Sequence, residues 1–403
     1  MEILDRPLFK TLQTLPPFPF AQLVRPDLKS VRLSRDAFLT NRTLPQFTYE
    51  RADRFDAKAY EQALNAVEDR ISSIPALESV RALYHEKILE TRTRLHIITA
   101  IQKHDAAAVS ANADHLFGNT AQSEQELTDE ASDMLARAHE LHTHRDRIDT
   151  ELFTHMVRTT LNYYDLHHWT IRPTSRASVS ILHGNDDQSA AVKIPKKFVA
   201  SRARAARLLT HEIEVHALRT HNGFTSPITL LGVGLAGYIA TDEGLAVATQ
   251  QKLRAEESMD PGFWDAWASV LTQGHDFTST FDVLYDARRK LNIAMNIPDA
   301  DVLARDTAWR LMVRVSRGIH TPGDTGIGYR RDHIYRSGLV TVRQAIETHG
   351  ESAILPTLFA GHAGIHHIPV LQSLGIRGRI PDLISKRIVK EVLADHRKKK
   401  KAP

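Results

Sequence analysis

The most constraining feature of the sequence is the spacing of two histidines in a segment with a helical pattern. Apolar residues predict a helix from about 201 to 220, and within it the string His-Glu-Ile-Glu-Val-His runs from His211 to His216. On an ideal α-helix five residues turn through about 500°, which leaves the two imidazoles about 140° apart. They can reach a common ligand only if the helix widens locally, as in a π-type turn. The sequence therefore predicts an extra residue in the helical turn between His211 and His216.

The absence of cysteine limits the kind of metal site that these histidines can join. The chain has 403 residues, of which 22 are histidine and none is cysteine. Disulfides, thiolate zinc sites and cysteine nucleophiles are therefore excluded, and any metal must be held by histidines and carboxylates. Because a histidine-rich chain contains pairs by chance, two unrelated histidines on an amphipathic helix would produce the same string.

Two carboxylates give the histidine pair a possible catalytic context. Hydrolytic zinc sites combine two imidazoles from one helix, a neighbouring carboxylate as general base and a third protein ligand, and one position stays open for water. Glu212 follows the first histidine directly. Glu243 stands at the start of a second predicted helix, which covers 244 to about 254. If the two helices pack antiparallel, Glu243 comes close to both histidines.

Neighbouring residues allow more than one role. Asp242 could orient an imidazole or cap the second helix. Gly244 could let the chain pass close to a metal or serve as an ordinary residue of a helix start, and Glu214 could be exposed or support a ligand.

The hydrophobic period changes near Trp169, which indicates an α+β fold that is mostly helical. After an irregular, proline-rich first forty residues, helical spacing predicts at least four helices before Trp169. Three short strands are predicted at 169–173, 177–182 and 190–194, and the last could pair with an extended peptide. The first helix after them should end at Asn222-Gly223.

These patterns predict three regions along the chain. They are an irregular N-terminal arm and helical region (1–165), a catalytic region with a small β-sheet and the histidine-bearing helix (166–396), and a basic disordered tail (397–403).

Composition limits the partners and the cellular location that we expect for the protein. The formal net charge of +4 comes largely from the tail. The tail could bind acidic partners, but the simpler interpretation is a solvated segment. We therefore expect a partner other than nucleic acid, and the oligomeric state is open. The N-terminus lacks the basic and apolar regions of a signal peptide and no apolar run is long enough to span a membrane, so we expect a cytoplasmic protein.

Three segments of the sequence resemble one protein family. The run Leu-Leu-Thr-His-Glu-Ile-Glu-Val-His-Ala-Leu-Arg-Thr-His-Asn-Gly (208–223), followed by Thr-Asp-Glu-Gly-Leu-Ala (241–246), resembles the microtubule-associated tyrosine carboxypeptidases and their bacterial members known by a "QEGLA" motif. Arg317-Gly318 and the segment 329–338 are similar to the family's Arg-Gly and Lys-Asp-x-x-Tyr-x-x-Gly strings. The resemblance extends from about Phe47 onward. It departs at Asp242, where the motif has Gln, and at Arg331, where Lys is expected.

The resemblance implies an activity and a set of ligands. It implies that His211, His216 and Glu243 hold one Zn²⁺ per chain, with Glu212 as general base. The implied reaction is hydrolysis of the C-terminal peptide bond of a peptide or protein tail. The eukaryotic relatives remove tyrosine, and whether this chain shares that preference is open.

A carboxypeptidase must also bind a terminal carboxylate, for which arginine is suited. The candidates, in order, are Arg317, Arg331 and Arg219. Tyr335 is the candidate donor to the oxyanion, and His320 is a weaker one. The alternative for each arginine is a surface or salt-bridged residue, and for Tyr335 a packed aromatic side chain.

Two other functions remain open from the sequence. Two histidines and one carboxylate also form the facial triad of non-haem Fe(II) oxygenases, although Glu212 would then have no task. A non-catalytic regulatory or binding protein that retains a metal site and acts through its basic tail is the second alternative.

Overall fold

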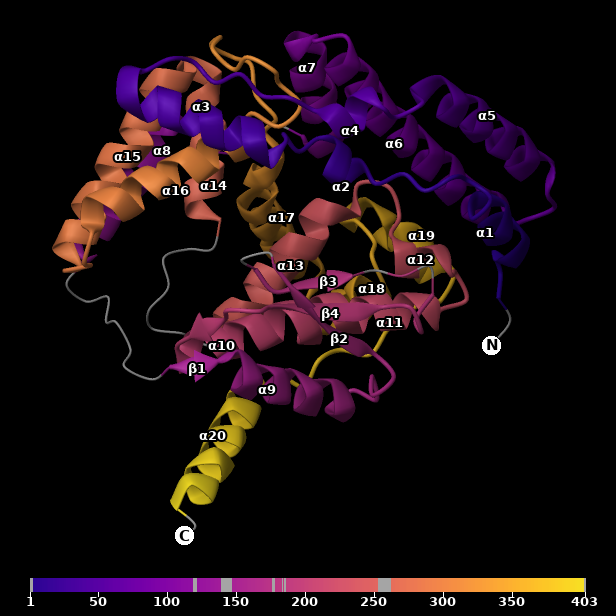
Figure 1. Cartoon of the computed structure of the whole chain (residues 1–403). Coiled ribbons are helices and arrows are strands. Elements are labelled where there is room, and N and C mark those ends of the chain that lie inside the picture. The colour runs from indigo at the N-terminus through magenta and orange to yellow at the C-terminus, as the bar shows by residue number, and fades with distance from the viewer. Residues whose placement is uncertain are drawn as a thin grey trace.

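Figure 1 shows a computed structural model of the chain, which describes residues 3–118, 122–138, 147–175, 178–182, 184, 186–252 and 262–401, the last three by backbone only. Helices dominate it, and they surround a small sheet. The α-helices are α1 (Arg6–Leu12), α2 (Phe20–Leu23), α3 (Leu28–Asn41), α4 (Glu50–Asp53), α5 (Ala57–Ser73), α6 (Glu78–Gln102), α7 (Ala106–Phe117), α8 (Glu124–Ala136), α9 (Thr150–Tyr163), α10 (Arg202–Leu208), α11 (Leu218–Phe224), α12 (Leu230–Val233), α13 (Tyr238–Lys252), α14 (Phe263–Gly274), α15 (Phe277–Ala294), α16 (Ala300–Val315), α17 (Ile334–His349), α18 (Glu351–Leu358), α19 (Ile368–Ser373) and α20 (Ser385–Lys401). The remaining elements are the π-helix η2 (Leu209–Ala217), the 3₁₀ turns η3 (Arg331–His333) and η4 (Ile365–His367), and the strands β1 (Ile148–Asp149), β2 (Thr170–Thr174), β3 (Ser180–Leu182), β4 (Ala191–Pro195) and β5 (Val199–Ala200).

The predicted α+β class is confirmed, and so is the helical region before Trp169, where α5 to α9 lie. The prediction that the first forty residues are irregular is wrong, because α1, α2 and α3 lie in this segment. Pro7 stands in the first turn of α1 and Pro19 directly precedes α2. Proline is tolerated at both positions, since the first backbone N–H groups of a helix have no helical partner.

The sheet follows the three predicted strands but differs in one functional detail. Its order is β2-β4-β3, with β2 parallel and β3 antiparallel to β4. The strand predicted at 190–194 is therefore central, and the expectation that it pairs with an extended peptide is wrong because both of its edges are already occupied. The strand predicted from 177 is observed from Ser180, and residue 177 itself lies outside the described residues.

Three hydrophobic cores hold the molecule together, and each of them contains residues from both sides of the boundary predicted near residue 165. The first contains the sheet, α9, η2 and parts of α13, α17 and α20. The second joins α3, α6 and α7 to α14, α15 and α16, and the third joins α1, α5 and α6 to α12 and α19. In Figure 1 the α14–α16 bundle lies beside α3 and α8, away from the sheet. The helices before and after residue 165 thus share cores.

The histidine-bearing helix continues beyond its predicted end. The segments α10, η2 and α11 form one uninterrupted helix from Arg202 to Phe224, so Asn222-Gly223 does not terminate it. Gly223 instead permits a close approach, because a Cβ atom there would overlap the backbone nitrogen of Gly232. Asn222 uses its side-chain amide to bind the carbonyl oxygens of Phe359 and Arg379.

The basic segment near the C-terminus also differs from expectation. Backbone residues 397–401 continue α20, where the sequence predicted a disordered tail, and residues 402–403 lie outside the described residues. The start of α20 is held by Glu214, which is fully buried rather than exposed. The Glu214 carboxylate accepts hydrogen bonds from the hydroxyl groups of Tyr164, Thr210 and Ser385 and from the backbone N–H of Ile384. It therefore fastens the π-helix to α9 and α20.

Helices α13 and α17 cross at two glycines, both of which belong to the strings quoted above. A Cβ atom on Gly244 would overlap the backbone carbonyl carbon of Gly338, and one on Gly338 would overlap the carbonyl oxygen of Ala240. No other residue type fits this crossing without moving one helix. Gly244 therefore serves the approach of α17.

Within the described ranges, no helix combines the length and the apolar composition that a membrane crossing requires.

The glycine crossing generates a stability prediction. Gly338→Ala should lower the free energy of unfolding by about 1–3 kcal/mol, because the added methyl group forces two packed helices apart. Chemical denaturation of the full chain measures this change. Gly274→Ala is the matched control, since this helical glycine has its nearest neighbour 3.7 Å from an added Cβ. Equal stability of both variants would show that the crossing tolerates a side chain.

Candidate active site

The π-helix predicted from the histidine spacing is present. Nine residues, Leu209–Ala217, form π-helical turns between the α-helical segments α10 and α11. Hydrogen bonds from i to i+5 widen the helix and bring residues five positions apart towards one side. The rings of His211 and His216 consequently lie with their centroids 4.6 Å apart at 77° to each other.

Helix α13 packs against η2 in the antiparallel direction that the sequence analysis assumed. Asp242 near its start contacts Arg219, and Gln250 near its end contacts the carbonyl oxygen of Arg207. The helix begins at Tyr238, earlier than predicted, and its predicted end near residue 254 lies outside the described residues. Glu243 is therefore an interior helical residue, with a direction fixed by the helix on both sides.

Glu243 meets both histidines. Its Oε2 atom lies 3.3 Å from Nε2 of His211 and 3.7 Å from Nε2 of His216, and the three ligand atoms fall within 4.8 Å of one another. This buried oxygen has no hydrogen-bond partner in the described part of the chain. Burial opposes ionisation, but His211 and His216 lower the pKa of Glu243 to about 2. An ionised, buried and unpartnered carboxylate oxygen between two imidazoles fits a divalent metal.

A buried network behind His216 fixes this ring. Oδ2 of Asp242 lies 2.8 Å from Nδ1 of His216, and Oδ1 binds Arg219 and Nδ1 of His362. Burial would raise the pKa of Asp242, but His216, His362 and Arg219 hold it well below its ordinary value. Because Asp242 stands in the second turn of α13, it has no part in capping the helix. Its contact with His216 matches the way that carboxylates orient metal-binding imidazoles.

Arg219 belongs to the same network and lies outside the cavity. Its side chain has no exposed area, and its guanidinium donates to Asp242 and to the carbonyl oxygen of Ala363, 3.0 Å away. A substrate carboxylate could reach it only by displacing Asp242. The structure thus places the third arginine candidate in support of Asp242.

His211 is oriented by Gln250, a residue that the sequence analysis missed. The side-chain amide nitrogen of Gln250 lies 2.8 Å from Nδ1 of His211 and 3.3 Å from the carbonyl oxygen of Arg207. In this arrangement Nδ1 accepts a hydrogen bond, so the neutral ring carries its proton on Nε2. A metal at Nε2 needs the other tautomer, in which the amide turns over and its oxygen accepts from Nδ1–H.

A cavity of about 210 Å³ opens in front of these residues. It is lined by Leu208, His211, Glu212, Gln250, Gly262, Asp265, Arg314 and Tyr335. The lining thus combines η2 and α13 with α14 and α16 of the second core. Burial raises the pKa of the Glu212 carboxyl above its ordinary value, which suits a group that exchanges protons.

Three arginines gather around one buried carboxylate beside the cavity. Asp332 lies 2.7 Å from Arg314 Nε, 3.5 Å from Arg317 and 3.7 Å from Arg331. Burial would raise the pKa of Asp332, but these guanidinium groups hold it well below its ordinary value. Asp265 lies 3.0 Å from Arg314, and burial raises its pKa to about 6. The cluster has more positive than negative charges, which favours an anionic ligand.

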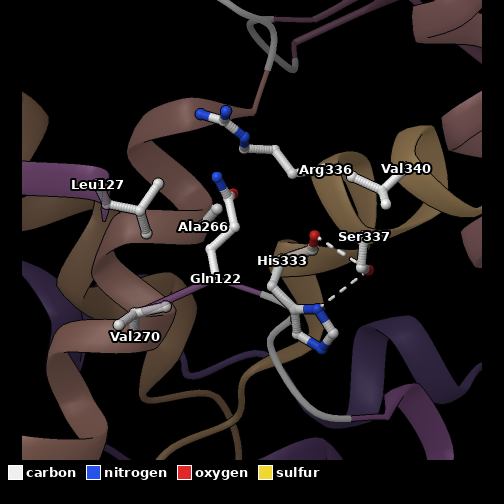
Figure 2. A pocket seen from close by; sticks show the side chains of 8 residues that line it. All are labelled: Gln122, Leu127, Ala266, Val270, His333, Arg336, Ser337 and Val340. Carbon is white, nitrogen blue, oxygen red and sulfur yellow. Dashed lines mark hydrogen bonds between the residues drawn. The ribbon is translucent and has the colours of Figure 1, made fainter. Parts of the chain in front are cut away.

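Tyr335 lines the cavity from the first turn of α17. The carboxylate of Glu243, and then burial, raise the pKa of the Tyr335 phenol well above its ordinary value, so the hydroxyl keeps its proton and can donate. Gly262 permits its position, because a Cβ atom there would lie 2.5 Å from Cβ of Tyr335. His333 faces a separate small hollow with Leu127 and Val270 (Figure 2).

The same view accounts for His333 as a structural residue. One ring nitrogen lies 3.2 Å from the hydroxyl of Ser337, as Figure 2 shows, and the other lies 3.0 Å from the carbonyl oxygen of Gly118. His320, the weaker oxyanion candidate, likewise contacts the carbonyl oxygens of Phe47 and Ile101 and stacks on His104. Neither histidine is among the residues that line the cavity.

Three residues of the site lay outside the sequence prediction. Gln250 follows Glu243 by seven positions, so helical periodicity could have identified it as a residue on the same face. Asp265 and Arg314 come from α14 and α16, and no local pattern distinguishes them from surface residues.

Comparison with known proteins points to one family. The sequence model described as microtubule-associated tyrosine carboxypeptidase matches residues 37–255 and 268–391. These segments include the residues of the candidate site except Gly262 and Asp265. No curated protein matches the chain.

The contact between Gln250 and His211 generates a prediction about metal affinity. Gln250→Leu should weaken metal binding at the His211, His216 and Glu243 cluster by about 10–100-fold, because the Nδ1–H tautomer loses its acceptor. Gln250→Glu should retain the affinity, since a carboxylate accepts the same hydrogen bond. Competition with a chromophoric chelator measures both constants. Equal weakening by both substitutions would contradict the tautomer argument.

Proposed function

Because the chain belongs to the microtubule-associated tyrosine carboxypeptidase family, we propose that it is a zinc metallocarboxypeptidase that removes one residue from the C-terminus of a peptide or protein. The observation that supports this most directly is the convergence of His211, His216 and Glu243 around an unpartnered oxygen, with Glu212 on the adjoining cavity. A hydrolase needs this combination of a ligand set, a general base and room for the scissile bond.

Zinc held by the three ligands would supply Lewis acidity towards a carbonyl oxygen and a water molecule. Glu212 then accepts a proton from the attacking water and later delivers it to the leaving amine. Its raised pKa brings the carboxylate closer to the proton affinity that both transfers require. Gln250 and Asp242 hold the two imidazoles while the substrate binds.

Tyr335 is the proposed donor to the oxyanion that forms on the substrate carbonyl. Its hydroxyl stays protonated beside Glu243, and it lines the same cavity as Glu212. A preorganised donor stabilises developing charge without reorganisation.

The arginine cluster is the proposed binding site for the terminal carboxylate. Arg317 and Arg331 were the leading candidates, and Arg314 joins them as the arginine that lines the cavity. Each binds Asp332, which orients the guanidinium groups before the substrate arrives. A free carboxylate would add a second anion to an environment with excess positive charge.

We also propose that the substrate is the C-terminal tail of a protein in the cytoplasm, with tyrosine as one candidate for the released residue. The family description names tyrosine and microtubules for its members. The identity of the released residue would show which side chain the protein prefers.

Mass spectrometry of a mixed peptide pool tests the reaction. The wild-type protein loaded with zinc should shorten peptides by single C-terminal residues, and Glu212→Gln should reduce the rate by at least about 100-fold because no group accepts the proton. Glu347→Gln, which changes an exposed glutamate of α17, is the matched control. Internal cleavage would contradict the carboxypeptidase assignment, and cleavage by the Glu212→Gln variant would contradict the role of the base.

Peptide amides test the carboxylate site. The wild-type enzyme should prefer a free C-terminus to the amide of the same peptide, and Arg317→Gln or Arg331→Gln should raise KM for the free acid by about 10–100-fold, as expected for loss of a charged hydrogen bond. In both variants the preference for the free acid over the amide of the same peptide should therefore be smaller than in the wild-type enzyme. Arg343→Gln is the control. Arg343 is an exposed arginine of α17 that binds Gln251 and is not one of the three arginines around Asp332. An unchanged preference in both variants would place carboxylate recognition elsewhere.

A further inference from the structure

A second group of possible metal ligands includes one residue of the continuous helix that carries His211 and His216. His168 precedes β2, Asp187 lies in the connection before β4, and His221 belongs to α11. Their ligand atoms fall within 4.8 Å of one another, as do those of the cluster around Glu243. Three segments that are separate in the sequence thus bring two imidazoles and one carboxylate together.

The carboxylate of Asp187 stands at the centre of this group. Its Oδ2 atom lies 2.8 Å from Nε2 of His168 and 2.7 Å from Nδ1 of His221. Its Oδ1 atom accepts a hydrogen bond of 3.0 Å from the indole N–H of Trp169, a side chain that is almost fully buried. Trp169 therefore anchors the carboxylate to the hydrophobic core and leaves Oδ2 facing the two imidazoles, which is the support that metal-binding carboxylates receive from neighbouring donors.

The exposure of the group is compatible with metal binding. The side chains of His168, Asp187 and His221 retain 19%, 15% and 25% of their exposure. This partial exposure gives an ion a path of entry and leaves space for water as a further ligand.

The spacing differs from that of the first cluster in one respect. Tetrahedral coordination with bonds of about 2.05 Å separates ligand atoms by about 3.3 Å. The oxygen–nitrogen distances here are 2.7 and 2.8 Å, which describe hydrogen bonds, so an ion requires the side chains to separate by about half an ångström. Side-chain rotation of the two partly exposed imidazoles accommodates this change.

We propose that His168, Asp187 and His221 bind a second divalent transition-metal ion, of which zinc is the best match to the donor set. This site is separate from the proposed catalytic one and does not depend on peptidase activity. It connects the start of β2 and the segment before β4 to α11. Because α11 continues η2, the bound ion stiffens the helix that presents His211 and His216.

Metal stoichiometry in the untagged full-length protein tests the proposal. The chain is stripped with a chelator, dialysed against excess Zn²⁺, desalted in the presence of a weak competing chelator and analysed by inductively coupled plasma mass spectrometry. The wild-type protein should hold two zinc ions per chain, and Asp187→Asn or His168→Gln should hold one. His211→Ala/His216→Ala should also hold one, and the combination with Asp187→Asn should hold none.

Controls separate the two sites and exclude a folding defect. His167→Gln removes the exposed neighbouring histidine and should leave two ions bound. Far-UV circular dichroism identifies any variant that fails to fold, and the second single variant then decides the result. One ion in the wild-type protein, unchanged by Asp187→Asn, would overturn the second site and leave the catalytic proposal intact. One ion in the wild-type protein that is retained by His211→Ala/His216→Ala and lost in Asp187→Asn would support the second site and contradict the catalytic one.

Discussion

The crossing of α13 and α17 at Gly244 and Gly338 is the contact on which the arrangement of the site depends. Backbone meets backbone there, because a Cβ atom at either position would overlap the opposite helix. Glu243 directly precedes Gly244, and Tyr335 lies one turn before Gly338. The crossing therefore determines how close a metal-ligand candidate on one helix comes to the proposed oxyanion donor on the other. A larger residue at either glycine would separate these groups before it disturbed any of their own contacts.

The second constraint is the widened helix, which is held in place by buried polar groups. A π-helix has less favourable packing than an α-helix and persists where its surroundings stabilise it. Glu214 supplies one such contact, since four hydrogen bonds satisfy its buried carboxylate. Asp242 supplies another through His216, Arg219 and His362. Buried charges are costly unless they are paired, so these paired carboxylates favour one arrangement of the two histidines.

The cavity lies where two hydrophobic cores meet. One wall comes from η2 and α13 in the core that contains the sheet, and the other from α14 and α16 in the core that contains the N-terminal helices. The arginines around Asp332 belong to the second wall and to the start of α17. The helices before residue 165 thus support the proposed carboxylate site, although the cavity lining in the described part of the chain comes from residues after 165. The proposed second metal site would act on the first wall alone, through the end of α11.

The sequence by itself determined the features that depend on local spacing. The five-residue separation of His211 and His216 required a π-type turn because the geometry of one helix is a local property, and alternation near Trp169 located the strands for the same reason. Only the tertiary structure decided which side chains from distant segments meet. It buried Glu214, directed Arg219 to Asp242, placed the strand at 190–194 in the centre of the sheet and brought Arg314 and Asp265 to the cavity. These outcomes depend on how helices pack, and the periodicity of one segment carries no information about the partner that its face will meet.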